Sequence, residues 1–469
     1  METKKWGLWI LTAFVIGNMV GGGVFMLPAN LAHVSGPMGS TLAWSITGLG
    51  VFMIALVFGN LAIRKPELKA GPQSYAQAMF TSQKTGKVAG YSMAWGYWAA
   101  NWAANWAATA SVIISFAGYL STFFPVLQSK QILFSTNGFS LELGKALTFI
   151  VCSMMLWGIQ YILSQNIDRA GNMNLLATIA KIIGFTMFIV ITLFIFNASN
   201  FGDGQTFMNE AGQPISLGGQ INSAAIATLW AFIGIESAVM LSNRAKSQHD
   251  VKKATIFGLI IALLIYMAIT LLTMGALPQD ALKESQKPLV DALNLAIGTK
   301  GAYIMALLAL VSLFGSTVGW IVVSSEVPYQ AAKNGLFPKF FSKTNKKGSP
   351  SKSLFITNVM TQIFLFSTIS GTVSEAYNFA IVVATLAYLI PYLVSTLYQL
   401  KLVITGETYD IMPGSRIKDG IITALAFLYS IWVIKTGTAD LKTFFLGIGL
   451  FVLGLILYPV LMKDSQKKQ

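Results

Sequence analysis

The sequence predicts an all-α membrane protein with twelve transmembrane helices, and three observations support this fold class. First, 54% of the 469 residues are hydrophobic and only 11% are charged, a composition foreign to soluble domains. Second, apolar runs of about 20 residues, the length that crosses a hydrocarbon core of about 30 Å, recur throughout the chain. Third, two of these runs are interrupted at mid-length, where lipid tolerates unwound backbone only beside a protein-lined cavity.

The predicted spans follow one another with short connections. In the first half they cover residues 6–33, 37–63, 88–124, 144–163, 172–197 and 221–242. In the second half they cover residues 254–277, 301–332, 353–370, 375–400, 419–435 and 441–462. The first run has no secretory cleavage pattern and continues at full length, so we expect it to remain in the protein.

Basic residues orient these spans, because short loops rich in Lys and Arg stay on the cytoplasmic side. Most of the 32 Lys and Arg residues fall on the side that holds Lys4 and Lys5, so both termini are predicted to be cytoplasmic. The net charge of +14 is spread over separate loops, which argues against nucleic-acid binding. Since the connections are too short for a core of their own, residues 1–469 are predicted to form one transmembrane domain.

The interrupted spans are the first, at Gly21–Gly23, and the sixth, at residues 230–236. Transporters built from inverted repeats place a discontinuous helix at the matching position of each half. The spacing therefore predicts two five-helix repeats of opposite orientation, residues 6–197 and 221–400. Two additional helices follow within residues 419–462.

Two facing helix breaks match the charges of an α-amino acid. The N–H groups at a helix N-terminus suit a carboxylate, and the carbonyl groups at a helix C-terminus suit an ammonium group. The glycines could instead serve only for close helix packing. Three glycines in succession, in register with a second break, favour a binding site for a zwitterion.

Three stretches of the chain carry a family resemblance. Residues Gly17–Ala32 read GNMVGGGVFMLPANLA, Trp230–Ala238 read WAFIGIESA, and Gly319-Trp320 is followed by Asn334–Pro338, NGLFP. They resemble the first, sixth and eighth helices of the amino acid/polyamine/organocation transporters, most closely the basic amino acid and polyamine antiporter branch. The resemblance covers nearly the whole chain and implies exchange of amino acids by alternating access.

The resemblance also implies residues that contact the substrate. They are Asn18, Gly21, Gly22, Gly23, Trp230, Ile233 and Trp320. The glycine backbone would hold the carboxylate, and carbonyl groups near Trp230 and Ile233 would hold the ammonium group. The two tryptophans would act as aromatic gates over the substrate side chain, since aromatic faces attract cations by roughly 0.5–2 kcal/mol. For any one tryptophan, packing or an interfacial position is the competing interpretation.

Weaker polar candidates lie nearby on the predicted helices. Asn101 follows Tyr97 by one turn, so it could contact the substrate tail or hydrogen-bond a neighbouring helix. Ser316 precedes Trp320 by one turn and is expected to line the site. Ala384 stands where the family has a small hydroxyl residue, a departure that could alter selectivity.

Glu236 lies inside a predicted span, where an acid is costly unless it is paired, protonated or hydrated. The resemblance groups Glu236 with Tyr97 and Tyr392 as a cluster that closes the cytoplasmic side. Two roles remain open for this acid. It either acts as a switchable hydrogen-bond hub or only caps the unwound backbone of the sixth helix.

Lys181 lies in the middle of the apolar fifth span. In proton-coupled members of the superfamily, a lysine at the matching position replaces the sodium site of the sodium-driven relatives. The arginine/agmatine exchangers, by resemblance, have an apolar residue there. The sequence leaves two interpretations open: a group that exchanges a proton, or a permanently charged brace between the first and eighth helices.

Enzyme chemistry is not predicted. His33 and His249 have no Cys or carboxylate neighbours at metal-ligand spacing, and Cys152 is the single cysteine. We therefore expect no catalytic residue, no metal and no cofactor. An ion channel would need a continuous charged or carbonyl-ringed pore, which the sequence does not indicate.

The sequence predicts a secondary active transporter that exchanges cationic amino acids, of the arginine/ornithine type, in a bacterial inner membrane. The alternative is a proton-coupled permease for lysine or for neutral amino acids, in which Lys181 carries the proton. The expected partners are a small amino acid substrate and the lipid bilayer, with no nucleic acid. A monomer and a homodimer fit the sequence equally well.

Overall fold

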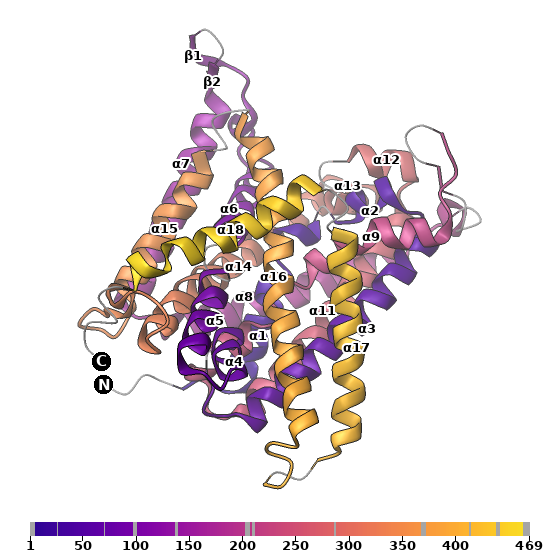
Figure 1. Cartoon of the computed structure of the whole chain (residues 1–469). Coiled ribbons are helices and arrows are strands. Elements are labelled where there is room, and N and C mark those ends of the chain that lie inside the picture. The colour runs from indigo at the N-terminus through magenta and orange to yellow at the C-terminus, as the bar shows by residue number, and fades with distance from the viewer. Residues whose placement is uncertain are drawn as a thin grey trace.

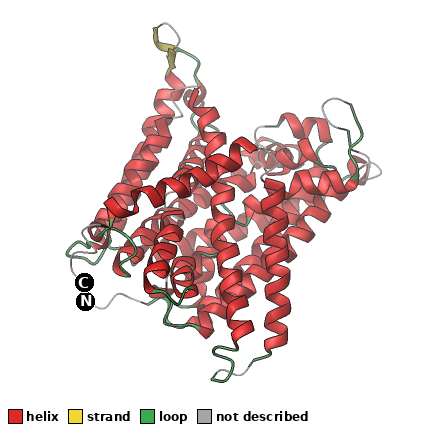
Figure 2. Cartoon of the chain, viewed as in Figure 1, coloured by secondary structure: helices red, strands yellow, loops and turns green. Residues whose placement is uncertain are grey.

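The computed structural model shows a mostly helical chain (Figure 1, Figure 2). The structure describes residues 5–25, 27–69, 71–96, 101–136, 139–201, 207–208, 212–285, 288–366, 372–411, 414–437 and 441–462. Figure 2 shows that strands form only a small hairpin at one tip of the described chain.

The helical elements of the first half lie between Leu8 and Phe201. They are α1 (Leu8–Met19), η1 (Gly22–Phe25), α2 (Leu27–Val34), α3 (Pro37–Arg64), α4 (Pro72–Met79), α5 (Gln83–Trp95), α6 (Asn101–Leu120), η3 (Pro125–Gln128), α7 (Leu143–Gln165), α8 (Arg169–Leu193) and η4 (Ala198–Phe201).

The helices of the second half begin with another broken pair. They are α9 (Leu217–Ala231), α10 (Ser237–Met240), η5 (Ser242–Arg244), α11 (Gln248–Ala276), α12 (Gln279–Glu284), α13 (Pro288–Ile297), α14 (Thr299–Lys333), η6 (Lys339–Ser342), α15 (Ser351–Leu365), α16 (Thr372–Thr405), α17 (Arg416–Gly437) and α18 (Leu441–Leu461).

Several helices have the length and composition of membrane spans. Among the described residues, six qualify fully, namely α3, α7, α8, α11, α14 and α17. Shorter apolar helices are found in α1, in α13, in the second half of α16 and in the second half of α18. These helices indicate a protein that crosses a membrane several times.

Helix α8 shows how the spans are oriented around the core. Leu176, Ile179 and Ile183 are exposed on one side of the helix, whereas Thr178 and Lys181 on the other side are buried. An apolar side turned outward suits lipid, and the polar side is turned toward α1 and α14. The fifth span therefore separates lipid from the polar interior.

Parts of the structure differ from the sequence expectation of helices alone. Strand β1 (Ile132–Thr136) pairs antiparallel with β2 (Phe139–Glu142), and this hairpin projects beyond the helices in Figure 1. The sequence between the strands, Asn137-Gly138, is the dipeptide that two-residue hairpin turns favour. That signal, between residues rich in β-branched and aromatic side chains, could have predicted the hairpin.

The third predicted span, residues 88–124, contains the last part of α5 and all of α6, and residues 97–100 between these helices lie outside the described part of the chain. The connection at residues 278–300 also holds helices, α12 and α13.

Candidate functional site

Both predicted interruptions are confirmed. The first helix leaves the α conformation after Met19, and Val20 has φ −80° and ψ 68°. The chain continues through the 3₁₀ turn η1 into α2. The sixth helix ends at Ala231 and resumes at Ser237. Unwound backbone at these two points leaves peptide groups free to bind partners other than their own helix.

Gly234 brings the two breaks into direct contact. Its φ is +108°, and a Cβ atom at this position would lie 2.9 Å from the Cβ of Asn18 and 3.0 Å from the backbone N of Met19. The amide of Asn18 also donates a hydrogen bond to the hydroxyl of Ser237, 2.8 Å away. Only glycine combines this backbone conformation with so close an approach.

Two indole rings flank the glycine segment of the first helix. The Nε1 atom of Trp230 lies 3.7 Å from the place that a Cβ would take at Gly23. The Nε1 atom of Trp320 lies 3.9 Å from the corresponding place at Gly21. Trp230 is partly buried and Trp320 is buried. The structure therefore brings together three helices that the sequence suggested separately.

Neighbouring aromatic residues hold the end of α9. The Tyr266 hydroxyl donates to the carbonyl of Ala231 at 2.7 Å, and its ring stacks on Trp44. Beyond this point, the N–H of Ile233 donates to the carbonyl of Trp230 at 3.2 Å. Ile233 itself is buried. These contacts hold the carbonyl groups of the last two residues of α9, Trp230 and Ala231, in place.

Glu236 is completely buried and bridges the broken helix to α16. Its Oε2 accepts hydrogen bonds from the Gly234 N–H at 3.3 Å and from the Tyr392 hydroxyl at 2.5 Å. The carboxylate therefore both caps unwound backbone and links it to another helix. Tyr97, the third member of the expected cluster, lies outside the described residues, and the side chain of Asn101 is likewise not described.

Lys181 reaches from α8 to the end of α1. Its Nζ donates to the carbonyls of Gly17, at 3.3 Å, and Val20, and to the hydroxyl of Ser316, at 2.7 Å. The same hydroxyl donates to the Val20 carbonyl at 3.3 Å. All of these acceptors are neutral oxygens. Because the C-terminal end of a helix carries a partial negative charge, the ammonium group is well placed there.

Asn174 was not singled out by the sequence, although it faces the same region. Its amide is buried, and both polar atoms lack a hydrogen-bond partner within the described part of the chain, as does Oδ1 of Asn18. Glycines make the room for these amides: a Cβ at Gly319 would lie 2.2 Å from Oδ1 of Asn18, and one at Gly17 would lie 2.7 Å from Oδ1 of Asn174.

A buried ion pair ties the region after α10 to α14. Arg244 donates to Oε2 of Glu326 from Nε at 3.2 Å and from a terminal nitrogen at 3.0 Å. Trp6 pairs with this segment through backbone hydrogen bonds to Arg244 and Lys246. Sequence reasoning missed this network, although an acid inside the predicted span 301–332 is the kind of signal that marks a functional or paired group.

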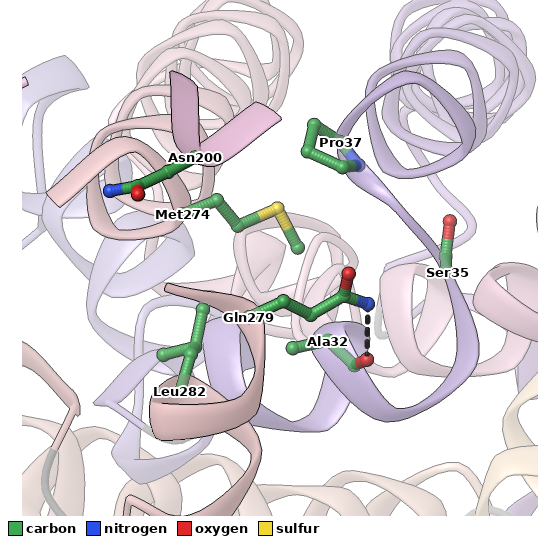
Figure 3. A pocket seen from close by; sticks show the side chains of 7 residues that line it. All are labelled: Ala32, Ser35, Pro37, Asn200, Met274, Gln279 and Leu282. Carbon is green, nitrogen blue, oxygen red and sulfur yellow. Dashed lines mark hydrogen bonds between the residues drawn. The ribbon is translucent and has the colours of Figure 1, made fainter. Parts of the chain in front are cut away.

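The C-terminal end of α2, away from the glycine segment, packs against α12. Figure 3 shows a small pocket there, in which the Gln279 amide donates to the Ala32 carbonyl at 3.1 Å. His33 also contacts the carbonyl of Lys283 at 3.0 Å. The pocket is lined by Ala32, Ser35, Pro37, Asn200, Met274, Gln279 and Leu282. These uncharged residues fasten α2 to the connection that follows α11.

Comparison with known proteins adds to this geometry. The family model described as amino acid permease matches residues 7–460. A Bacillus subtilis protein, whose name assigns arginine/ornithine antiport provisionally, is 58% identical over 100% of this chain and 99% of its own length. An arginine/ornithine antiporter of Pseudomonas aeruginosa is 34% identical over 97% of this chain and 91% of its own length. An arginine/agmatine antiporter of Chlamydia trachomatis is 34% identical over 97% of this chain and 89% of its own length.

Proposed function

The chain belongs to the amino acid permease family, and from this membership we propose that it exchanges cationic amino acids, arginine against ornithine, by alternating access. The observation that carries the proposal is the meeting of two broken helices beside two tryptophans, in a chain similar along its whole length to antiporters named for arginine and ornithine. The relatives are transporters, so an enzyme is not implied.

The substrate carboxylate binds at the start of η1 in this proposal. The N–H of Gly21 already donates to the Met19 carbonyl at 2.8 Å. The N–H groups of Gly22 and Gly23, at the first positions of η1, are therefore the donors, because the first N–H groups of a helix have no acceptor within it. Gly21 instead leaves room beside Trp320.

The substrate ammonium group binds to oxygen atoms around the other break. Carbonyl groups near Trp230 and Ile233 lie at the end of α9, the negative end of that half-helix. The buried Oδ1 of Asn18, which lacks a partner among the described residues, is a further acceptor. Trp230 and Trp320 then close over the cationic side chain, with Asn101 at its tail.

Two residues take positioning roles. The Ser316 hydroxyl accepts a hydrogen bond from Lys181 and donates one to the Val20 carbonyl. These bonds favour a role in positioning Lys181 over direct contact with the substrate. The three neutral oxygens around Lys181 support the role of a charged brace between α1 and α14. The alternative is a proton-coupled permease in which Lys181 carries the proton, and an experiment must distinguish it from the antiporter.

Glu236, Tyr392 and Tyr97 gate the cytoplasmic side of the site. The hydrogen bond between Glu236 and Tyr392 connects the broken sixth helix with α16, so it must change when these elements move apart. In this mechanism the first, second, sixth and seventh spans rock against the third, fourth, eighth and ninth.

The architecture proposed for this mechanism has twelve spans in one domain. Residues 6–197 and 221–400 form the two inverted repeats, and residues 419–462 add two helices. The protein lies in the inner membrane of a bacterium with both termini in the cytoplasm, as the distribution of Lys and Arg indicates. Its surface is compatible with a monomer or a homodimer in the bilayer.

Uptake of radiolabelled arginine into proteoliposomes tests the proposal. We expect uptake into vesicles preloaded with ornithine and none into vesicles that hold buffer alone. Uptake into empty vesicles under an inward proton gradient would establish the proton-coupled permease. The absence of arginine uptake in every condition would overturn the assignment of a cationic substrate.

A further inference from the structure

A cavity of about 320 Å³ lies away from the broken helices, where the end of α3 meets the starts of α11 and α17. Charged and polar groups line one part of it, and aliphatic side chains line another. The lining residues are Leu56, Asn60, Ile63, Arg64, Lys252, Gly414, Ser415, Lys418, Asp419 and Ile422.

The one carboxylate in the lining is already satisfied. Asp419 accepts hydrogen bonds from Asn60 at 3.0 Å, from Arg64 at 2.9 Å and from the Tyr409 hydroxyl at 2.9 Å. The ring of Tyr409 also lies 3.8 Å below the guanidinium of Arg64. The charge of Asp419 is thus matched by Arg64, and this pair is a fixed wall of the cavity.

Two lysines of the lining form no ion pair within the described part of the chain, where the carboxylate of Asp419 is paired with Arg64. The ammonium group of Lys252 donates to the neutral Oδ1 of Asn60 at 2.9 Å. The side chain of Lys418 is exposed and forms no ion pair with the residues that the structure describes. Both cations line the same cavity, so an anion bound between them would offset their positive charge.

The aliphatic part of the lining indicates an anion that carries hydrocarbon. Leu56, Ile63 and Ile422 face the cavity, and Ile421 and Leu425 are exposed further along α17. A basic pocket between transmembrane helices, open toward an apolar helix surface, has the form of a phospholipid headgroup site. A free anion would leave the aliphatic part of the cavity unused.

We propose that this cavity binds the phosphate group of an anionic phospholipid, with Lys252 and Lys418 as its cationic contacts and the Ser415 hydroxyl as a further donor. The acyl chains then lie along α3 and α17. The site is separate from the proposed transport site, so its test does not depend on the transported substrate.

Native mass spectrometry of the full-length protein in detergent tests the proposal. Phosphatidylglycerol and phosphatidylcholine with the same acyl chains are offered together, and we expect one phosphatidylglycerol per chain to be retained preferentially. The double variant Lys252→Gln/Lys418→Gln should retain phosphatidylglycerol on the order of tenfold less. The control Lys84→Gln/Lys253→Gln removes two exposed cations outside the lining and should retain it as the wild type does.

Equal retention of the two lipids by the wild type would overturn the proposal without reference to any variant. Equal losses in both double variants would also overturn it, because they would indicate attraction to net charge alone. A third arm offers inorganic phosphate. Complete displacement of the lipid by millimolar phosphate would assign the site to the free ion and overturn the lipid, whereas retention in phosphate supports the headgroup.

Discussion

At the scale of single residues, Gly234 determines how closely the two broken helices approach. We expect Gly234→Ala to abolish arginine exchange and to lower the unfolding temperature. A side chain at φ +108° costs about 1–3 kcal/mol, and its Cβ would meet Asn18 and Met19 at 2.9–3.0 Å. Exchange in proteoliposomes and thermal unfolding in detergent measure the two effects.

Gly335 provides the matched control for this substitution. It has φ +71°, but no atom lies within 4 Å of its would-be Cβ in the described structure. Gly335→Ala should therefore lose some stability through backbone strain and keep exchange activity. Equal effects of the two substitutions on exchange would contradict a special role for the contact at Gly234.

Lys181 is the second residue with a testable role, either as a structural cation or as a proton-coupling group. Lys181→Met removes the cation, so the carbonyl of Gly17 loses this donor and the carbonyl of Val20 keeps only the Ser316 hydroxyl. Each buried acceptor left unpaired costs about 1–3 kcal/mol, so we expect lower thermal stability and slower exchange with an unchanged dependence on external pH. Retained transport that no longer responds to a pH gradient would instead identify Lys181 as the proton-coupling group.

At the scale of elements, the hydrogen bond from Tyr392 to Glu236 joins α16 to the broken sixth helix. If this contact gates the site, Glu236→Ala should reduce turnover more than it reduces arginine binding in detergent, because binding precedes the movement of the helices. Tyr392→Phe should show the same pattern to a smaller extent. Wild-type exchange by Glu236→Ala would eliminate the gating role.

The ion pair Arg244–Glu326 is a second connection between elements. A double-mutant cycle separates the energy of the pair from the cost of leaving one buried charge unpaired. Glu326→Leu leaves the buried Arg244 with only the more distant carboxylate of Asp168, at 3.9 Å. Removal of one partner of a buried ion pair costs about 3–5 kcal/mol in typical proteins. The double variant Arg244→Met/Glu326→Leu should recover much of this stability, because no buried guanidinium remains unpaired and Asp168, the other acid near Arg244, is partly exposed to solvent. Thermal unfolding of the wild type, the single variants Arg244→Met and Glu326→Leu, and the double variant measures the coupling energy, and a double variant no more stable than Glu326→Leu would refute the pairing.

At the scale of the whole molecule, the distribution of Lys and Arg predicts which ends of the helices face the cytoplasm. In a Cys152→Ala background, a membrane-impermeant maleimide added to intact cells should label Ser135→Cys in the exposed hairpin. It should not label Thr344→Cys in the exposed loop before α15 until the cells are permeabilised. The reverse pattern would invert the proposed topology.

The sequence by itself determined the membrane class, the positions of both helix breaks and the family. These properties are local: a run of apolar residues and a cluster of glycines specify the solvent and the backbone of their own segment. The hairpin at Ile132–Glu142 is equally local, because Asn-Gly is a dipeptide that two-residue hairpin turns favour.

Only the tertiary structure decided which groups meet. Lys181 binds Gly17, 164 positions away, and Arg244 pairs with Glu326, 82 positions away. The sequence indicated that Lys181 and Glu236 need partners inside the membrane, and it did not single out Arg244. The identity of the partner depends on how the helices pack, since a buried polar group is satisfied by whichever acceptor the neighbouring helix brings within about 3 Å.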